Sequence, residues 1–425
     1  MKKAGLLFVL IAAQYAGFSQ SQTQRVLFVG NSYTYYNNMP QIVANLALSL
    51  GDTLIHDSST PPGYSFVQHV SNATTLQKIG AGGWDYVVLQ EQSQKPSFPM
   101  AQVEAEVLPY AAQLNNMVLE SSPCAQTVFY MTWGRKFGDA GNCPAWPPVC
   151  TYEGMDDLLY ERYMLMAELN NAIVSPVGAL WRYIIENHPG IDLYDPDGSH
   201  PSESGSFAAA CAFYTVLFRK NPATSPYNFI LPPAMAETIR NAAETVIYNN
   251  LEQWSVGLFD ITSSFETSST TVDPLEPVSF TNLSTNANAY LWDFGDGNLS
   301  NEENPEHVYE TAGMFNVQLT AYSDCDSAVS SAQINLIITG KEDISSQNKV
   351  VLYPNPSSGD VFITNNGPAI RRILLIDGWG RTSEITDNLV DGRPISLAHL
   401  SSGVYFLRVY DIHGKVSTHK IIRAR

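Results

Sequence analysis

Val26-Leu-Phe-Val-Gly30-Asn31-Ser32-Tyr33-Thr34 is the stretch around which the first part of this chain is organised. Its short apolar run is typical of a buried parallel strand, and the periodic segment that begins near Met39-Pro40 predicts a helix after it. A serine on such a turn lies at the carboxyl edge of a sheet, where open α/β folds bind ligands. Nearby peptide N–H groups can face developing negative charge. Ser32 is therefore a candidate nucleophile, although the stretch alone favours an ordinary turn serine.

Strand-like and helix-like segments alternate from residue 25 to about residue 254. The strand-like runs are 26–29, 53–56, 84–90, 127–133 and, more weakly, 172–177. The helix-like segments are 39–50, 65–79, 100–118, 152–171 and 204–219, with a final one at 234–251. Such alternation indicates βαβ units, in which helices cover both faces of a parallel sheet. The first domain is predicted to be α/β and to end near residues 255–265.

The N-terminus has the layout of a secretory signal peptide, which we assign to residues 1–20. Lys2-Lys3 precede a short apolar segment from Ala4 to about Ala16, and polar residues follow it. That segment is too short for a membrane span, and no later apolar run reaches the required length. We therefore expect a protein that is exported through the periplasm and has no transmembrane segment.

Charge and cysteine content narrow the choice of ligand. The formal net charge is −18, from 23 Lys and Arg against 41 Asp and Glu. This surface disfavours nucleic acid as a partner but is compatible with neutral ligands such as sugars. The five cysteines fit no zinc pattern, so no metal or cofactor is expected. Cys143 and Cys150 bracket a Pro- and Trp-rich loop that a disulfide could close, whereas Cys211 is expected to be a buried apolar residue.

A second segment can supply the base that a serine nucleophile needs. Tyr194-Asp195-Pro-Asp197-Gly-Ser-His200-Pro201 precedes a predicted helix, and Asp197 and His200 are three residues apart in a Pro- and Gly-rich turn. Such a turn can bring a carboxylate to an imidazole and fix which ring nitrogen faces the serine. Asp195 is a weaker candidate for the same role.

Together, Gly30-Asn31-Ser32 and Asp197-Gly-Ser-His200-Pro201 resemble the first and last blocks of the SGNH (GDSL-like) hydrolases, in the same order along the chain. The resemblance covers roughly residues 25–255, so we assign residues 21–256 to a hydrolase domain. It implies a three-layer, flavodoxin-like parallel sheet. It also implies that Ser32 attacks an ester, that His200 is the general base and then acid, and that Asp197 orients His200.

The resemblance also implies an oxyanion hole, formed by the Ser32 N–H, the Gly63 N–H and the Gln92 side-chain amide. Gln92 stands where the family has asparagine, and Asn31 stands where it often has aspartate. A glutamine can donate the same hydrogen bond from one methylene further out. The stretch 84–93 looks like one secreted bacterial branch of the family.

Three further residues are candidates for binding substrate at the sheet edge. Trp133 and Arg135 follow the fourth predicted strand and could stack on, or hydrogen-bond to, a sugar or an acyl carboxylate. A buried tryptophan is an equally good interpretation of Trp133. Tyr33 could line the cleft or cap the core. His69 is expected to be a structural histidine on a helix face.

The remainder of the chain predicts two small all-β, immunoglobulin-like sandwich domains. Residues 262–340 contain Trp292-Asp-Phe294-Gly-Asp296-Gly297 and resemble a PKD domain, which could bind glycan or act as a spacer. Residues 345–425 contain Leu352-Tyr-Pro-Asn-Pro356 and Leu400-Ser-Ser-Gly403, and they resemble the C-terminal sorting domain of type IX secretion. That resemblance implies that the secretion machinery is a partner and that the protein is secreted or on the cell surface.

The leading hypothesis is a secreted serine esterase that removes acetyl or another short acyl group, with an acylated glycan as a candidate substrate. Two alternatives stay open. One keeps the triad but acts on lipids or thioesters. The other is a non-catalytic adhesin or glycan-binding protein on a hydrolase scaffold, against which the intact Ser32, Asp197 and His200 argue.

Overall fold

The computed structural model describes residues 21–269, 276–336, 350–365, 367–377, 380–385, 394–413 and 415–424. The predicted signal peptide, 1–20, and the polar linker at 340–348 lie outside these residues. The chain divides after Asp260 into two compact units, which we describe separately.

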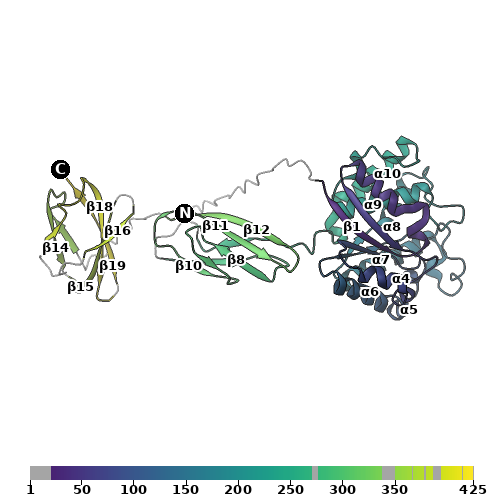
Figure 1. Ribbon diagram of the computed structural model, residues 1–425, viewed down its shortest axis with the longest axis horizontal. Helices are drawn as coiled ribbons and strands as arrows, with labels where there is room; N and C mark the ends of the chain where they lie inside the picture. Colours follow the sequence, from purple (N-terminus) through teal and green to yellow (C-terminus); the bar gives the residue numbers. More distant parts are fainter. Residues whose placement is uncertain are drawn as a thin grey trace, which may run out of the picture. The chain divides into compact units, whose positions relative to one another are not determined.

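A parallel sheet forms the centre of the first unit, and its strand order is β2-β1-β3-β4-β5 (Figure 1). The strands are β1 (Thr23–Val29), β2 (Thr53–Ser59), β3 (Tyr86–Leu89), β4 (Gln126–Tyr130) and β5 (Ile173–Ser175). All four residues of β3 are buried, as expected for a strand covered on both faces. The order reverses between β1 and β3, and ligands of flavodoxin-like folds bind at this reversal.

Helices cover both faces of the sheet, which confirms the predicted three-layer α/β fold. Helices α8, α9 and α10 lie on one face and α4, α5 and α6 on the other (Figure 1). The helices of this unit are α1 (Ser32–Tyr35), α2 (Met39–Ser49), α3 (Phe66–His69), α4 (Ala73–Gly80), α5 (Met100–Glu106), α6 (Leu108–Ser121), α7 (Tyr152–Leu169), α8 (Val177–Asn187), α9 (Glu203–Phe218) and α10 (Pro233–Val246). Short 3₁₀ helices include η1 (Tyr36–Asn38), η2 (Lys95–Ser97), η3 (Pro147–Cys150), η4 (Pro222–Thr224) and η5 (Tyr248–Trp254).

Two predicted helices are each divided in the structure, and one helix was not predicted. The segment 65–79 forms α3 and α4, because Asn72 caps a new helix by accepting a hydrogen bond from Thr75 N. The segment 100–118 forms α5 and α6, and Pro109 lies in the first turn of α6, where its missing N–H costs nothing. Helix α8 follows β5 directly, and no helix was expected there.

Helix α9 lies at the centre of the apolar core. Every residue from Ser204 to Phe218 is buried, so this helix has no exposed face. Phe213 packs edge-on against Phe28 of β1 and Tyr130 of β4, with ring centroids 5.5 and 4.8 Å apart. This contact fixes the helix that begins just after His200 against the strand that ends just before Ser32.

The second unit begins with two antiparallel sheets, in the orders β10-β7-β6 and β12-β11-β8-β9. Their strands are β6 (Phe265–Thr267), β7 (Pro277–Asn282), β8 (Ala289–Asp293), β9 (Leu299–Ser300), β10 (Glu306–Val308), β11 (Gly313–Tyr322) and β12 (Ser327–Leu336). Trp292, Phe294, Val317 and Leu319 are buried in the shared core, as the alternation of apolar residues predicts.

Two further antiparallel sheets follow, in the orders β13-β14-β17 and β16-β15-β18-β19. Their strands are β13 (Val350–Tyr353), β14 (Asp360–Asn365), β15 (Ile370–Ile376), β16 (Thr382–Ile385), β17 (Pro394–Ser396), β18 (Gly403–Asp411) and β19 (Val416–Arg423). Val361, Leu375, Leu407 and Ile421 lie in their core. The small all-β character predicted for this part of the chain is confirmed.

Candidate active site

A tight turn after β1 presents Ser32. A Cβ atom on Gly30 would lie 2.5 Å from Thr34 Oγ1 and 2.6 Å from Gln90 Oε1, so only glycine fits. Gln90 Oε1 accepts hydrogen bonds from Asn31 N (2.8 Å) and from Thr34 Oγ1 (2.9 Å). The end of β3 therefore holds the turn in place. Sequence reasoning missed Gln90, whose only signal is its position directly after a buried strand.

Ser32, His200 and Asp197 come together in a continuous hydrogen-bonded series. His200 Nε2 lies 2.9 Å from Ser32 Oγ, and His200 Nδ1 lies 2.5 Å from Asp197 Oδ2. Because an ionised carboxylate only accepts hydrogen bonds, Nδ1 carries the proton and Nε2 faces the serine hydroxyl as an acceptor. Asp195, the weaker candidate, contacts His200 through its backbone N–H and the His200 carbonyl oxygen.

The Asp197 carboxyl is held as an anion. Partial burial by itself would raise its pKa, but hydrogen bonds from the His200 ring and from the backbone N–H groups of Ser199 and His200 outweigh that effect. The pKa of Asp197 therefore lies below its usual value, and the carboxylate is ionised across the neutral range.

Two buried aromatic side chains hold the loop that carries His200 in place. Trp133 Nε1 donates to the Ser199 carbonyl oxygen (3.1 Å), and the hydroxyls of Tyr33 and Ser199 lie 2.6 Å apart. The rings of Tyr33 and Trp133 stack with centroids 4.8 Å apart, and Trp133 stacks on Trp181 at 3.7 Å.

These contacts correct two of the predicted substrate-binding residues. Trp133 is 0% exposed and Tyr33 is 3% exposed, and both faces of the Trp133 ring are occupied by other rings. Neither side chain can therefore stack on a sugar. The buried alternative is the correct interpretation, and both residues support the His200 loop.

The three predicted oxyanion residues lie on neighbouring loops. Asn31, next to Ser32, donates through Nδ2 to the carbonyl oxygen of Tyr64 (2.8 Å), which brings the turn at Gly63 to the turn that carries Ser32. Gly63 has φ +71°, a left-handed conformation that favours glycine. The Gln92 amide donates to Gln94 Oε1 (3.0 Å) and accepts from Gln94 N (2.9 Å).

His69 is a buried structural residue, as expected, and it contacts the turn that carries Ser32. Its Nε2 lies 2.9 Å from the Gly30 carbonyl oxygen and its Nδ1 2.9 Å from Thr75 Oγ1. Burial lowers the pKa of His69 to about 4, so the ring is neutral and donates from Nε2 to the carbonyl.

Glu91 connects the loop after β2 to the loop after β3, and sequence reasoning did not single it out. Its fully buried carboxyl group accepts from Phe66 N (3.1 Å) and from Gln92 N (2.5 Å). Burial raises the pKa of Glu91 to about 8, although these N–H groups and Lys95 favour the charged form. Glu91 thus holds together the two loops that carry Gly63 and Gln92.

The raised pKa of Glu91 predicts a specific dependence of stability on pH. A carboxyl group whose pKa is higher in the folded state stabilises the fold fully below the unfolded-state pKa and loses that contribution as pH rises through the folded-state value. The melting temperature of wild type, relative to that of Glu91→Gln, should therefore fall by several degrees between about pH 5 and about pH 8.5. Calorimetry at a series of pH values measures this difference.

Glu104→Gln is the matched control, because Glu104 is an exposed glutamate on α5. Its melting temperature should keep a constant offset from wild type over the same range. A constant offset for Glu91→Gln as well would show that Glu91 takes up no proton on folding.

Arg135 lies beside a pocket at the carboxyl edge of the sheet. Its Nη1 is 3.7 Å from Asp139 Oδ1, and its Nη2 donates a long hydrogen bond to Ser93 Oγ (3.4 Å). The pocket has a volume of about 510 Å³, and Asp197 forms part of its lining. Unlike Trp133, Arg135 keeps a partly exposed side chain and stays a candidate for binding substrate.

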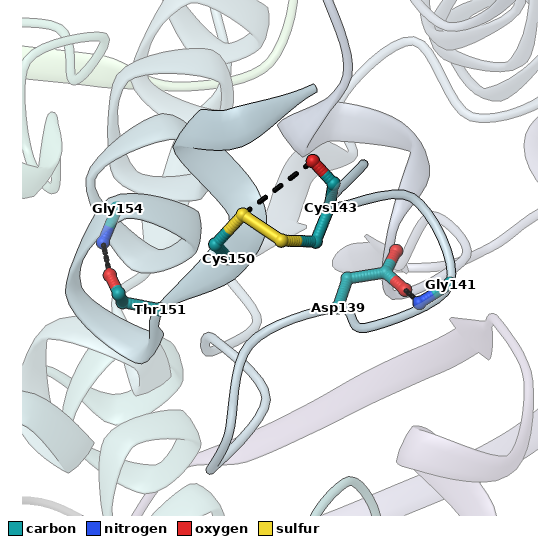
Figure 2. The surroundings of a disulfide bond; sticks show 6 residues. All are labelled: Asp139, Gly141, Cys143, Cys150, Thr151 and Gly154. Carbon is teal, nitrogen blue, oxygen red and sulfur yellow. Dashed lines mark hydrogen bonds between the residues drawn. A yellow bond between two sulfur atoms is a disulfide. The ribbon is translucent and has the colours of Figure 1, made fainter. Parts of the chain in front are cut away.

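The loop next to this pocket is closed by a disulfide between Cys143 and Cys150 (Figure 2). Cys211 is a buried free cysteine, as expected. Among the described residues, no group of three or more His, Cys, Asp or Glu side chains is arranged to hold a metal ion. No helix in the described part of the chain combines the length and apolar character needed to cross a bilayer.

Comparisons with known families decide the nature of the second unit. The PKD domain model matches residues 265–338, and the model of the secretion system C-terminal sorting domain matches residues 351–423. The chain carries a PKD domain and a type IX sorting domain. The sorting domain implies an interaction with the type IX secretion machinery and indicates secretion or display at the cell surface.

A 36-residue stretch is 56% identical to Collagenase ColQ1 of Bacillus cereus (strain Q1). This match covers 8% of the chain and 4% of the collagenase. The PKD1 domain of the Vibrio cholerae metalloprotease PrtV is 34% identical over 18% of this chain and 95% of that chain, with a TM-score of 0.16.

Two solved structures resemble larger parts of the chain. A DUF4886 family protein from Bacteroides uniformis is 19% identical over 52% of this chain and 94% of that chain, with a TM-score of 0.47. A putative SGNH hydrolase from Slackia heliotrinireducens is 26% identical over 45% of this chain and 97% of that chain, with a TM-score of 0.38.

Proposed function

We propose that this chain is a secreted serine esterase that hydrolyses short-chain acyl esters, with acylated glycans as its substrates. The observation that carries the proposal is the series of contacts from Ser32 Oγ to His200 Nε2 (2.9 Å) and from His200 Nδ1 to Asp197 Oδ2 (2.5 Å). A serine hydroxyl becomes a nucleophile when a base takes its proton and a third group orients the base.

In the proposed reaction, Ser32 Oγ attacks the ester carbonyl carbon while His200 Nε2 accepts the hydroxyl proton. The C–O bond to the alcohol then breaks, and His200 returns the proton to the leaving alcohol. Water attacks the acyl-serine with His200 again as base, which releases the carboxylic acid and restores Ser32. Asp197 stays ionised throughout and stabilises the imidazolium.

Negative charge develops on the carbonyl oxygen in both steps. We assign its stabilisation to the N–H groups of Ser32 and Gly63 and to the Gln92 side chain. An amide has two N–H bonds, so Gln92 can hold Gln94 with one and face the oxyanion with the other. Removing one such donor typically costs about 3 kcal/mol of transition-state stabilisation.

The pocket beside Asp197 supports a substrate whose alcohol part carries polar groups. Its lining combines the polar side chains of Gln94, Arg135, Asp139 and Asn142 with the ring of Phe137. An acetate-release screen over acetylated glycans, with Ser32→Ala as control, tests the proposal together with a series of p-nitrophenyl esters of increasing chain length. Fastest turnover of long-chain esters would favour the lipase or thioesterase alternative.

The sorting domain predicts a second phenotype that is separable from catalysis. A chain that stops after Ile344 keeps the catalytic residues but lacks the domain that the secretion machinery recognises. Such a chain should keep its esterase activity in cell lysates and accumulate in the periplasm, as fractionation and activity assays would measure. Release of the truncated chain into the medium at the normal level would contradict this.

A further inference from the structure

The pocket beside the catalytic loop is built by a loop that the proposed reaction does not use. It is lined mainly by the segment 137–142, together with Gln94, Arg135 and residues 197–199. Its volume of about 510 Å³ falls within the range of small-molecule sites. Neither Ser32 nor His200 lines it, so it adjoins the reacting atoms on the Asp197 side without containing them.

The buried carboxylate of Asp139 fixes the floor of this pocket. It accepts hydrogen bonds from Gln94 Nε2 (2.7 Å), Asn142 Nδ2 (2.6 Å) and Gly141 N (3.2 Å), the last of which is shown in Figure 2. A Cβ on Gly138 would lie 2.5 Å from the backbone of Cys150. The turn is therefore packed directly against the disulfide-closed loop, which gives the pocket a fixed shape before any ligand binds.

The wall of the pocket carries an exposed aromatic ring. Phe137 is 76% exposed, and a Cβ on Gly198 would lie 3.3 Å from its ring. The ring therefore lies against the catalytic loop and leaves most of its surface open to solvent. A large exposed aromatic residue beside polar groups is typical of a site that binds a ligand with one apolar and one polar face.

The polar side of the pocket favours an uncharged ligand. The Arg135 guanidinium is accompanied by Asp139, 3.7 Å away, and the pocket also contains the Asp197 carboxylate. Arg135 has five N–H donors, more than its contacts with Asp139 and Ser93 use. Together with a net charge of −18, this arrangement suits hydroxyl groups better than a carboxylate.

We propose that this pocket is a subsite for a neutral pyranose unit of the substrate, next to the unit that carries the acyl group. Phe137 packs against the C–H face of the sugar ring, and Arg135 donates hydrogen bonds to its hydroxyl oxygens. The inference rests on the proposed esterase function, and it adds that the enzyme recognises a neutral oligosaccharide, not an isolated ester.

The full chain and its Phe137→Ala variant test this subsite on acetylated xylo-oligosaccharides and on p-nitrophenyl acetate. We expect the ratio of kcat/KM for the oligosaccharide to that for p-nitrophenyl acetate to fall about ten-fold in the variant, mainly through KM. Phe137→Tyr keeps the ring and should restore most of the ratio. Leu48→Ala, an exposed apolar residue on α2, should leave both activities unchanged.

The outcomes separate this inference from the proposed function. If wild type hydrolyses p-nitrophenyl acetate but Phe137→Ala leaves the ratio unchanged, the subsite is wrong and the esterase stands. If acetylated oligogalacturonides are better substrates than the neutral oligosaccharides, the inference of an uncharged ligand is overturned. If wild type hydrolyses none of these esters, the proposed function itself fails.

Discussion

Ser32→Ala is expected to lower kcat for short acyl esters by about 10⁴- to 10⁶-fold. The rate that remains is the one that the oxyanion hole and substrate binding provide without the nucleophile. The variant lacks the oxygen that forms the acyl-enzyme, which in the wild-type protein lies 2.9 Å from His200 Nε2. Stopped assays with p-nitrophenyl acetate measure the loss.

The fold should survive this substitution. Removing the hydroxyl deletes one hydrogen bond of a partly buried side chain, which typically costs about 1 kcal/mol. Ser71→Ala is a suitable control, because Ser71 is exposed and its hydroxyl donates only to the Gln68 carbonyl oxygen among the described residues. A folded Ser32→Ala protein with near-normal turnover would remove Ser32 from the mechanism.

Asp197→Asn is expected to lower kcat by about a thousand-fold or more, because it changes which nitrogen of His200 carries the proton. An asparagine can turn its N–H₂ group toward Nδ1, which then accepts a hydrogen bond and leaves the proton on Nε2. The imidazole could no longer accept the proton of Ser32. His200 Nδ1 and Asp197 Oδ2 are only 2.5 Å apart, so the position of the proton on His200 depends directly on the group at residue 197.

Asp195→Asn provides the matched control in the same turn. Asp195 is two residues from Asp197, and its backbone N–H donates to the His200 carbonyl oxygen. Its kcat should therefore stay within about three-fold of wild type, since the substitution keeps the size of the side chain and the backbone contact with His200. A larger loss of kcat for Asp195→Asn than for Asp197→Asn would show that Asp195, and not Asp197, orients His200.

The parts of the site that could be predicted from the sequence are those with a local signature. Ser32 follows a strand and a required glycine, and Asp197 and His200 share one turn, but each pattern alone is also typical of an ordinary turn. Only the two segments together, through their resemblance to the first and last blocks of the SGNH hydrolases, predict a catalytic triad. The parallel sheet follows from the alternation of apolar runs. The buried residues of α8 also have helical spacing, so a local signal for this helix is present although the predicted elements do not include it: Val177, Leu180, Trp181 and Ile184.

The remaining parts depend on which surfaces the fold buries. Trp133 stands at the sheet edge in the sequence pattern, but stacking on Tyr33 and Trp181 places it inside. The roles of Gln90 and Glu91 depend on contacts with residues 59 and 25 positions away, respectively. No local pattern encodes such contacts, because they arise only when β1 and β3 pair and the adjoining loops converge.

The measurement that tests the central claim most directly is labelling of the full chain with a fluorophosphonate probe, followed by mass spectrometry of the modified peptide. Ser32 Oγ would attack phosphorus and displace fluoride, so one phosphonyl group is expected on the peptide that contains Ser32. Labelling should be absent from Ser32→Ala and strongly reduced in a His200→Ala variant. A folded wild-type protein that stays unlabelled, or a label on another serine, would contradict the account.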